Sequence, residues 1–383
     1  MKKIVYILKS FALKAGVERV MSDKMNELAA RGYDVTLITY EQGRHPHAFP
    51  LHPSVHHVDL DTRFLEIMRY GLLRRMPMMK RLRRQFRSRL QAALDDIQPQ
   101  VLVVSTCSIK LMDIIFSVHT DAHRIIESHA PCYSVKKSFY YRNNIFLRTV
   151  ARWYDDWMLG QARKADAVVT LTQGDAKEWN RYTSKTYVIP NPVTAYPQVV
   201  KRHDGSGRRI ICAGRLNFEK RYDRMIDAFA RVADQCPEWH VDIFGEGDDK
   251  AALQEKIRHH HLEHRIRINA PTSDIYTEYQ NSEFFVLSSQ YEGFGLVLVE
   301  SMSCGIPCVA FRCKYGPEDI IDDGINGLLV EDGNVTELAE KIRWMATHTE
   351  ERLRMGLKAR EDVRRYERNA IMQQWITLFE QFF

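Results

Sequence analysis

Short, nearly continuous apolar runs alternate with segments of helical periodicity through the first half of the chain. Continuous apolar runs are typical of strands that are buried on both faces, and helical segments between them predict parallel crossover connections. The predicted strands are residues 4–8, 35–39, 101–104, 124–127, 167–171 and 186–189. The pattern therefore predicts an α/β domain with a doubly wound parallel sheet.

A second series of the same kind begins after residues 194–207, a polar, glycine-bearing stretch that we interpret as a domain linker. Ile189-Pro190-Asn191-Pro192 punctuates the chain just before it. The second series has predicted strands at 209–213, 240–244, 266–269, 283–287, 307–311 and 327–330, predicted helices at 222–234 and 336–346, and a helical tail from about residue 350. The sequence thus predicts two Rossmann-like halves, with ligands expected in a cleft between them at the carboxyl ends of the strands.

Length and composition narrow the class of protein. A chain of 383 residues suits two domains, and 45% apolar with 27% charged residues excludes the disordered and collagen-like classes. No apolar run approaches the roughly 18 residues needed to span a bilayer. The first eight residues imitate a signal peptide, but Lys9 ends the apolar run and no cleavage site follows. We therefore expect a soluble, cytoplasmic protein.

The cysteines and histidines do not predict a metal site. Seven cysteines scattered over a long chain indicate reduced thiols. Cys304, Cys308 and Cys313 lack metal-ligand spacing, so we expect them to be small buried hydrophobic residues. The histidines without metal spacing, interpreted as surface polar residues, are His45, His47, His52, His56, His57, His259, His260 and His261.

Positive charge is concentrated in residues 63–89, which hold ten Arg and Lys against one acid, Glu66, within a chain of net charge +6. Apolar residues recur there every third or fourth position, so we expect a helix that Pro77 kinks or splits. Three interpretations stay open: a core-packing helix with a solvated face, a surface helix on anionic lipid, and, least favoured, a nucleic-acid patch. The cations that would face a membrane are Arg74, Arg75, Lys80, Arg81, Arg83, Arg84 and Arg87.

Residues 284–300 read as a strand, a glycine loop and the start of a helix. Gly293 and Gly295 let backbone N–H groups approach a ligand closely, and the helix amino terminus favours an anion, so this loop predicts a phosphate site. Glu300 lies two helical turns beyond Glu292, and we expect both on nearly the same helix face. Glu300 is a candidate acceptor for two ribose hydroxyls.

Other candidates also follow predicted strands. Gly214, Arg215 and Lys220 come after the first strand of the second half, where the two cations would bind a diphosphate; the alternative is two surface cations. Gly245-Glu246-Gly247 is a weaker glycine turn. His129 follows the strand at 124–127 and is either a site residue or a structural histidine. Ala15-Gly16 opens a helix without a GxGxxG pattern, which counts against a nicotinamide dehydrogenase.

Taken in order, these motifs resemble the family 4 retaining glycosyltransferases of the GT-B fold. The motifs that carry the resemblance are the Gly16-Val17-Glu18-Arg19 turn, the Ile189-Pro190-Asn191-Pro192 linker, Gly214-Arg215-x4-Lys220, Glu292-Gly-Phe-Gly-x4-Glu300 and Gly324-x2-Gly327. The resemblance implies two Rossmann-like domains facing a central cleft. It implies an acceptor domain of residues 1–193 with a helix of residues 366–383 crossing back, and a nucleotide-sugar domain of residues 194–365.

The resemblance also implies roles for individual residues. Arg215 and Lys220 would bind the donor diphosphate, Glu292 the donor sugar hydroxyls and Glu300 the ribose, while His129 would face the sugar. The residues that would line the remaining donor site are Gly16, Gly214, Gly245, Gly293, Phe294, Gly295 and Leu296. The family usually has Gly-Gly in its first turn, where this chain has Ala15-Gly16.

The implied reaction moves a hexose or N-acetylhexosamine from a nucleoside-diphosphate sugar, by family habit a UDP-sugar, to a hydroxyl of a saccharide acceptor with retention. The basic segment suggests a lipid-linked acceptor at a membrane surface, in cell-surface polysaccharide assembly. We expect no metal cofactor, because cations can stabilise the leaving phosphate and no Asp-x-Asp motif stands at a suitable strand end. The alternatives are a sugar-nucleotide epimerase of the same architecture and a non-catalytic nucleotide-sugar-binding subunit; no nucleic-acid partner is expected.

Overall fold

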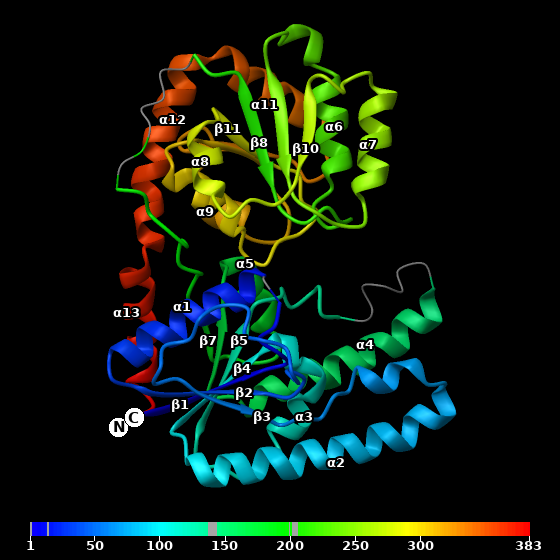
Figure 1. The fold of residues 1–383 in the computed structure, drawn as a ribbon, viewed down its shortest axis with the longest axis vertical. Helices are drawn as coiled ribbons and strands as arrows, with labels where there is room; N and C mark the ends of the chain where they lie inside the picture. Colours follow the sequence, from blue (N-terminus) through cyan, green and yellow to red (C-terminus); the bar gives the residue numbers. More distant parts are fainter. Residues whose placement is uncertain (1, 14, 137–143, 199, 201–205) are drawn as a thin grey trace. The chain divides into compact units, whose positions relative to one another are not determined.

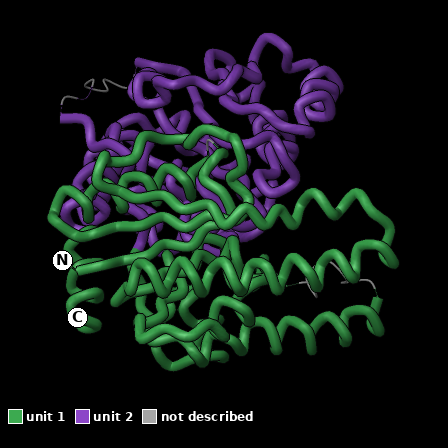
Figure 2. The backbone as a smooth tube through the Cα atoms, turned by 60° about the horizontal axis from the view of Figure 1, so that its bottom comes forward, with its two compact units in different colours: residues 1–189, 372–383 green, residues 190–371 purple. Residues whose placement is uncertain are grey.

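The computed structural model describes residues 2–13, 15–136, 144–198, 200 and 206–383 in two compact units. Unit 1 comprises Met1–Ile189 and Met372–Phe383, and unit 2 comprises Pro190–Ile371 (Figure 2). The sequence placed the two boundaries four and six residues away from these, after residues 193 and 365. Part of the expected linker, residues 201–205, lies outside the described residues.

Unit 1 is built on a seven-stranded parallel sheet with the strand order β3-β2-β1-β4-β5-β6-β7 (Figure 1). Its strands are β1 (Lys3–Leu8), β2 (Asp34–Thr39), β3 (His56–Asp59), β4 (Val101–Ser105), β5 (His123–Ser128), β6 (Ala167–Thr170) and β7 (Thr186–Val188). Six of them were predicted. The sequence missed β3, because this edge strand is only half-buried and contains His56 and His57 in place of an apolar run. Those two histidines are strand residues, and Thr39 Oγ1 lies 2.9 Å from His57 Nε2.

The helices of unit 1 cover both faces of this sheet. They are α1 (Gly16–Ala30), α2 (Leu72–Ile97), α3 (Met112–Ile115), α4 (Ile145–Leu159) and α5 (Gln173–Trp179). Pro77 was expected to kink or split the basic helix; a split is wrong, because α2 begins after Gly71 and runs through Pro77 without a break. Proline lacks an N–H and so removes one backbone hydrogen bond, which is not enough to end a helix of 26 residues. The buried residues of α2 are Phe86, Leu90 and Leu94, so only its second half packs on the core.

Unit 2 has a six-stranded parallel sheet with the order β10-β9-β8-β11-β12-β13. Its strands are β8 (Arg209–Ala213), β9 (His240–Phe244), β10 (Ile266–Asn269), β11 (Phe284–Leu287), β12 (Cys308–Phe311) and β13 (Gly327–Val330), all of which were predicted. Its helices are α6 (Tyr222–Ala230), α7 (Lys250–His259), α8 (Ile275–Gln280), α9 (Leu296–Ser303), α10 (Pro317–Ile320), α11 (Val335–Thr347) and α12 (Thr349–Asp362). Cys304, Cys308 and Cys313 are buried, as predicted.

The strand order of unit 2 determines where a ligand can bind. From β8 the chain moves to β9 and β10 on one side, and then returns to place β11 on the other side of β8. Helices on opposite faces leave a crevice at such a switch point, at the carboxyl ends of the two strands. The loops that follow β8 and β11 are therefore neighbours, although about seventy residues separate them in the sequence.

The C-terminal residues return to unit 1. Helix α13 (Arg368–Phe379) comes after α12 in the chain. The part of α13 from Met372 onward, with the residues that follow it to Phe383, belongs to unit 1. Its Trp375 ring lies 3.9 Å from the ammonium nitrogen of Lys24 on α1. Within the described residues, no helix is both long and apolar enough to cross a membrane.

Candidate functional site

Two loops of unit 2, residues 214–221 after β8 and residues 288–295 after β11, are joined by backbone hydrogen bonds. The Gln290 N–H donates to the Glu219 carbonyl over 2.8 Å. The Ser288 hydroxyl donates to the Lys220 carbonyl over 2.9 Å. These hydrogen bonds hold the two loops together at the switch point of the sheet. The predicted site residues in the two loops are therefore neighbours.

Lys220 and Glu292 form an ion pair across these loops. Lys220 Nζ lies 2.6 Å from Glu292 Oε1, and the two side chains are 17% and 11% exposed. The Ser289 hydroxyl donates to the same carboxylate oxygen over 2.6 Å. Glu292 is also held by its backbone, which exchanges hydrogen bonds with Lys314 and Tyr315. An ammonium has three donors, so Lys220 can bind a further anion without releasing Glu292.

Arg215 lies in the same loop but is not part of this pair. Its side chain is 75% exposed, and its guanidinium lies 4.0 Å from Glu219 Oε2. Glu219 in turn accepts a hydrogen bond from the Tyr291 hydroxyl over 2.6 Å. Arg215 is therefore linked to the second loop through Glu219 and leaves its fork-shaped donor set largely open to solvent. Glu219 and Ser289 lie inside the predicted motifs, but the sequence pattern did not indicate a role for either of them.

A side chain could not be accommodated easily at Gly245, where two turns approach closely, or at Gly295, where φ is positive. A Cβ atom at Gly245 would lie 2.0 Å from the Gly214 carbonyl oxygen, so the turns after β8 and β9 can approach only because Gly245 has no side chain. Gly295 has φ +100 and caps α9. Because the chain turns there in the left-handed region, the helix starts only at Leu296.

This start corrects the expectation that Glu292 and Glu300 share a helix face. Glu292 precedes Gly295 and lies in the loop, whereas Glu300 is in α9. Gly293 lies in the bend between Glu292 and Phe294. The Phe294 ring is buried 5.4 Å from the Tyr366 ring, so only the backbone of Phe294 is suited to the predicted phosphate contact. The amino terminus of α9 still provides the N–H groups that favour an anion.

Glu300 has its own set of partners. The Thr194 hydroxyl donates to Glu300 Oε1 over 2.7 Å. The Tyr276 hydroxyl accepts from the Ala195 N–H over 2.8 Å. Burial first, and then the Glu300 charge, raise the pKa of Tyr276. The structure thus brings together Lys220 and Glu292, whereas Glu300, in the middle of α9, is held by Thr194. No motif in the sequence pointed to Thr194 or Tyr276.

In unit 1, His129 belongs to a buried cluster of charged groups. His129 Nε2 lies 3.2 Å from Glu127 Oε1, and both side chains are 1% exposed. Glu127 also forms an ion pair with Lys24, which is equally buried. Burial raises the pKa of Glu127, but the charges of Lys24 and His129 outweigh it and lower that pKa to about 2. Of the two interpretations of His129, as a site residue or as a structural histidine, this burial favours the structural one. Gly16 is exposed at the first position of α1.

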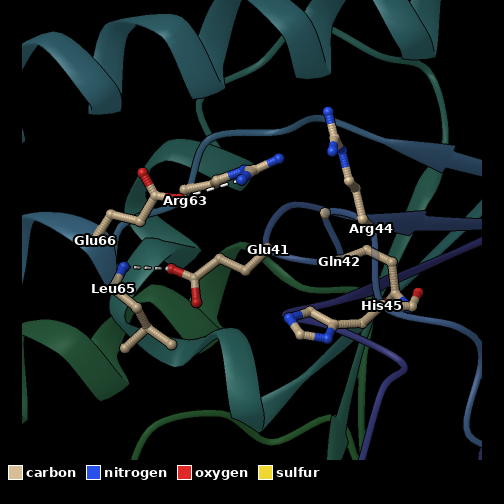
Figure 3. A pocket seen from close by; sticks show the side chains of 8 residues that line it. Glu41, Gln42, Arg44, His45, Arg63, Leu65 and Glu66 are labelled. Carbon is tan, nitrogen blue, oxygen red and sulfur yellow. Dashed lines mark hydrogen bonds and ion pairs between the residues drawn. The ribbon is translucent and has the colours of Figure 1, made fainter.

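A pocket of unit 1 lies just after β2 and was not anticipated from the sequence (Figure 3). Its volume is about 290 Å³. Its lining residues are Glu41, Gln42, Gly43, Arg44, His45, Arg63, Leu65 and Glu66. Glu41 accepts a hydrogen bond from the Leu65 N–H over 3.0 Å, and Arg63 lies 3.2 Å from Glu66. Arg44 is exposed and has no ion-pair partner within the described part of the chain, so this guanidinium is available to a ligand.

Over the residues that the structure describes, no group of three or more His, Cys, Asp and Glu side chains is arranged to hold a metal ion.

Comparison with known proteins matches both halves of the chain. Residues 15–195 match the family described as Glycosyltransferase Family 4, and residues 198–362 match Glycosyl transferases group 1. The chain is 25% identical to an uncharacterized glycosyltransferase of Haemophilus influenzae, covering 98% of this chain and 99% of that protein. It is 27% identical to the amylovoran biosynthesis glycosyltransferase AmsD of Erwinia amylovora, covering 85% of each.

Solved structures confirm the fold. Anabaena Alr3699/HepE, crystallised in complex with UDP-glucose, superposes with a TM-score of 0.73 at 18% identity, over all of both chains. The two units are thus the two Rossmann-like domains of the GT-B fold, as predicted.

The buried pair in unit 1 gives a stability prediction. Glu127→Gln leaves Lys24 buried without its counter-charge, and breaking such a pair costs about 3–5 kcal/mol of unfolding free energy. Because the pKa of Glu127 is lowered to about 2 in the folded chain, its contribution is present above its ordinary value of 4.5 and is lost as the pH falls from 4.5 to 2. Urea unfolding at pH 7 and pH 3 would measure this: the difference between the native chain and Glu127→Gln should shrink at pH 3.

The control for this experiment is the double variant Lys24→Met/Glu127→Gln, which removes both charges and should recover most of the lost stability. Equal stability of the native chain and Glu127→Gln at pH 7 would contradict the assignment of this pair as a structural element.

Proposed function

This chain belongs to the GT-B glycosyltransferases, and we propose that it transfers a hexose or N-acetylhexosamine from a UDP-sugar to a saccharide hydroxyl with retention of configuration. The UDP-glucose complex of Anabaena HepE supports the choice of donor. The Erwinia amylovora protein named for amylovoran biosynthesis supports a role in bacterial cell-surface polysaccharide assembly. The transfer itself is supported by the chemistry of the loops after β8 and β11.

The observation that carries the proposal is the Lys220–Glu292 ion pair at the switch point of unit 2. When the sugar leaves, negative charge develops on the β-phosphate of the donor. The ammonium of Lys220 is held within 2.6 Å of Glu292 and keeps free donors, so it can stabilise that charge without reorganising. Arg215, exposed in the same loop, offers a bidentate fork to the diphosphate. We assign to both residues the binding of the leaving group.

Glu292 is proposed as a sugar-positioning residue. Its Oε1 already accepts hydrogen bonds from Lys220 and Ser289, so the carboxylate is fixed in place. A fixed carboxylate is suited to accept from sugar hydroxyls and to hold the donor in one orientation. In the retaining mechanism that we favour, the acceptor hydroxyl attacks from the side that the phosphate leaves, and the leaving phosphate accepts its proton. The two loop cations would replace a metal in this reaction.

The acceptor is assigned to unit 1. We propose that the pocket after β2 binds the acceptor saccharide, because it combines carboxylate, amide, imidazole and guanidinium groups that can pair with hydroxyls. A lipid-linked saccharide would bring the enzyme to the inner face of a membrane as a peripheral, cytoplasmic protein. The excess of cations in residues 63–89 supports that location.

The test is turnover of a panel of nucleotide sugars with lipid-linked acceptors, followed by release of the nucleoside diphosphate. We expect Lys220→Met to lower kcat by roughly a hundredfold or more, because it removes a preorganised donor to the leaving phosphate. Lys358→Met is the matched control, since Lys358 pairs only with Glu361 and Asp362 of its own helix. EDTA should leave the rate unchanged.

Three outcomes would contradict this function. Conversion of the donor without any acceptor would indicate an epimerase, and donor binding without turnover would indicate a binding subunit. Full activity of Lys220→Met would remove the assigned role of the ion pair.

Glu300→Ala is expected to weaken binding of UDP about tenfold or more, because the ribose would lose a charged hydrogen-bond acceptor. Isothermal titration calorimetry with UDP measures this directly. Thr194→Val is the companion variant: it keeps the carboxylate but removes the hydroxyl that holds it, so its effect should be smaller. Unchanged UDP binding by Glu300→Ala would show that Glu300 does not face the nucleotide.

Arg44→Ala is expected to raise the KM for the saccharide acceptor about tenfold or more, since a hydrogen bond to a charged group contributes about 1.5–3 kcal/mol. The dissociation constant for UDP should stay the same, because Arg44 belongs to unit 1. Arg343→Ala, a change of an exposed arginine in unit 2, serves as the control. A change in UDP binding with an unchanged acceptor KM would contradict the assignment of the pocket.

A further inference from the structure

Helix α4 carries an apolar stripe that no described part of the chain covers. Phe146, Val150, Trp153 and Trp157 recur at spacings of four, three and four residues, so they lie on one face of the helix. These side chains are 46% to 76% exposed. The opposite face is buried in unit 1 through Ala151, Asp155, Met158 and Leu159. Packing of α4 on unit 1 uses only its opposite face, so it does not explain two exposed tryptophans and an exposed phenylalanine on this stripe.

Helix α2 has a similar character in its first half. Leu72, Leu73 and Met76 are 63%, 89% and 63% exposed. The next turns line a groove of about 440 Å³ that opens to solvent. The groove has an apolar part formed by Met76, Met79 and Ile114, and a basic part formed by Lys80, Arg83, Arg84 and Arg87. Arg83 is tied to Asp113 by an ion pair, whereas Lys80 and Arg84 are exposed.

Helices α2 and α4 are neighbours in unit 1, because Tyr154 of α4 lies within electrostatic reach of Arg83 on α2. The amino-terminal ends of α2 and α4 both extend past the edge of the sheet, in the same direction, and the helices run side by side in both views (Figures 1 and 2). The most exposed apolar residues of α2 lie near its amino terminus, with the cations following in the next turns, whereas those of α4 run along the helix from Phe146 to Trp157. One surface therefore combines an aromatic stripe with a dense set of positive charges.

We propose that this surface, formed by the outward faces of α2 and α4, binds an anionic bilayer, with the α4 stripe inserted at the interface and the α2 cations on the headgroups. Tryptophan and phenylalanine partition into the interface, and basic residues are attracted to anionic lipid. The proposal rests on the proposed membrane location but not on the transfer reaction. It adds α4, which has no excess of basic residues and gave no signal in the charge pattern.

The charge and the apolar character of this surface favour an anionic bilayer over a second copy of the chain or a nucleic acid. A second copy of the chain on the same surface would bring the cations of both α2 helices together, which opposes association. A nucleic acid would neutralise the cations but would leave the aliphatic residues Leu72, Leu73, Met76 and Val150 in water. An anionic bilayer satisfies both the positive and the apolar part of the surface.

The experiment measures sedimentation of the purified full chain with two kinds of vesicle, phosphatidylcholine alone and an equal mixture of phosphatidylcholine and phosphatidylglycerol. The native chain should bind the anionic vesicles. Phe146→Ser/Trp153→Ser should weaken that binding roughly tenfold or more, because it removes two inserted side chains. Lys80→Gln/Arg84→Gln should weaken it about fivefold per cation at low salt.

Matched controls use exposed residues of unit 2. Leu357→Ser removes an apolar side chain that is 73% exposed on α12, and Arg343→Gln/Arg354→Gln removes two exposed cations. Both should bind like the native chain. Trp153→Phe tests insertion without loss of apolar character: it should still bind, but brominated lipid should quench less of the tryptophan emission than in the native chain.

The proposal is overturned if the native chain does not sediment with anionic vesicles, or if the α4 variant binds them as tightly as the Leu357 control. It is also overturned if the α4 variant only converts a dimer to a monomer, or if salt-sensitive binding to single-stranded RNA replaces vesicle binding. UDP release with a water-soluble saccharide acceptor should be the same in every variant, so failure of this proposal is distinct from failure of the transferase function.

Discussion

The adjacency of β8 and β11 is the constraint on which the candidate site depends. Parallel strands need crossover connections, and in unit 2 these leave β8 in both directions, so the loops after β8 and β11 meet at one edge of the sheet. Lys220 and Glu292 are 72 residues apart in the sequence and 2.6 Å apart in the structure for this reason. The Gln290 N–H and the Ser288 hydroxyl of the second loop donate to the carbonyls of Glu219 and Lys220 and hold the first loop in place, so that little reorganisation is needed when charge develops.

Charged groups have two distinct uses in this molecule, and burial separates them. The Lys24–Glu127 pair with His129 is almost fully buried, where a charge is stable only with its partner, so the cluster holds α1 and β5 together. Trp375 packs on Lys24 and ties the C-terminal helix to the same place. Lys220 and Arg215 are at loops open to water, where a cation can exchange partners. Such groups can bind and release an anionic substrate, whereas a buried pair cannot.

A third environment is the outer surface of unit 1, where exposed apolar side chains of α2 and α4 occur near the basic residues of α2. In α2 the periodicity of the apolar residues is continuous, but only Phe86, Leu90 and Leu94 meet the core. The same helix is thus a packing element in its second half and a surface element in its first. Helix α4 divides its two faces in the same way, with Met158 inside and Trp153 outside. Amphipathic periodicity alone does not distinguish a face that packs on a sheet from one that remains exposed.

The sequence by itself determined the six strands of unit 2 and six of unit 1, because strands buried on both faces must be apolar throughout. It also determined the glycine loops, since Gly245 and Gly295 occupy positions that other residues disfavour. It could not identify β3, whose side chains are only half-buried, or the start of α9 at Leu296, which depends on the φ of Gly295.

Only the tertiary structure decided which polar groups meet. It joined Lys220 to Glu292, gave Glu300 to Thr194, buried His129 against Glu127 and left the aromatic stripe of α4 uncovered. The physical reason is that hydrophobic periodicity fixes which residues turn inward, a local property. Partnerships between polar side chains depend on strand order and loop contacts between segments that are distant along the chain.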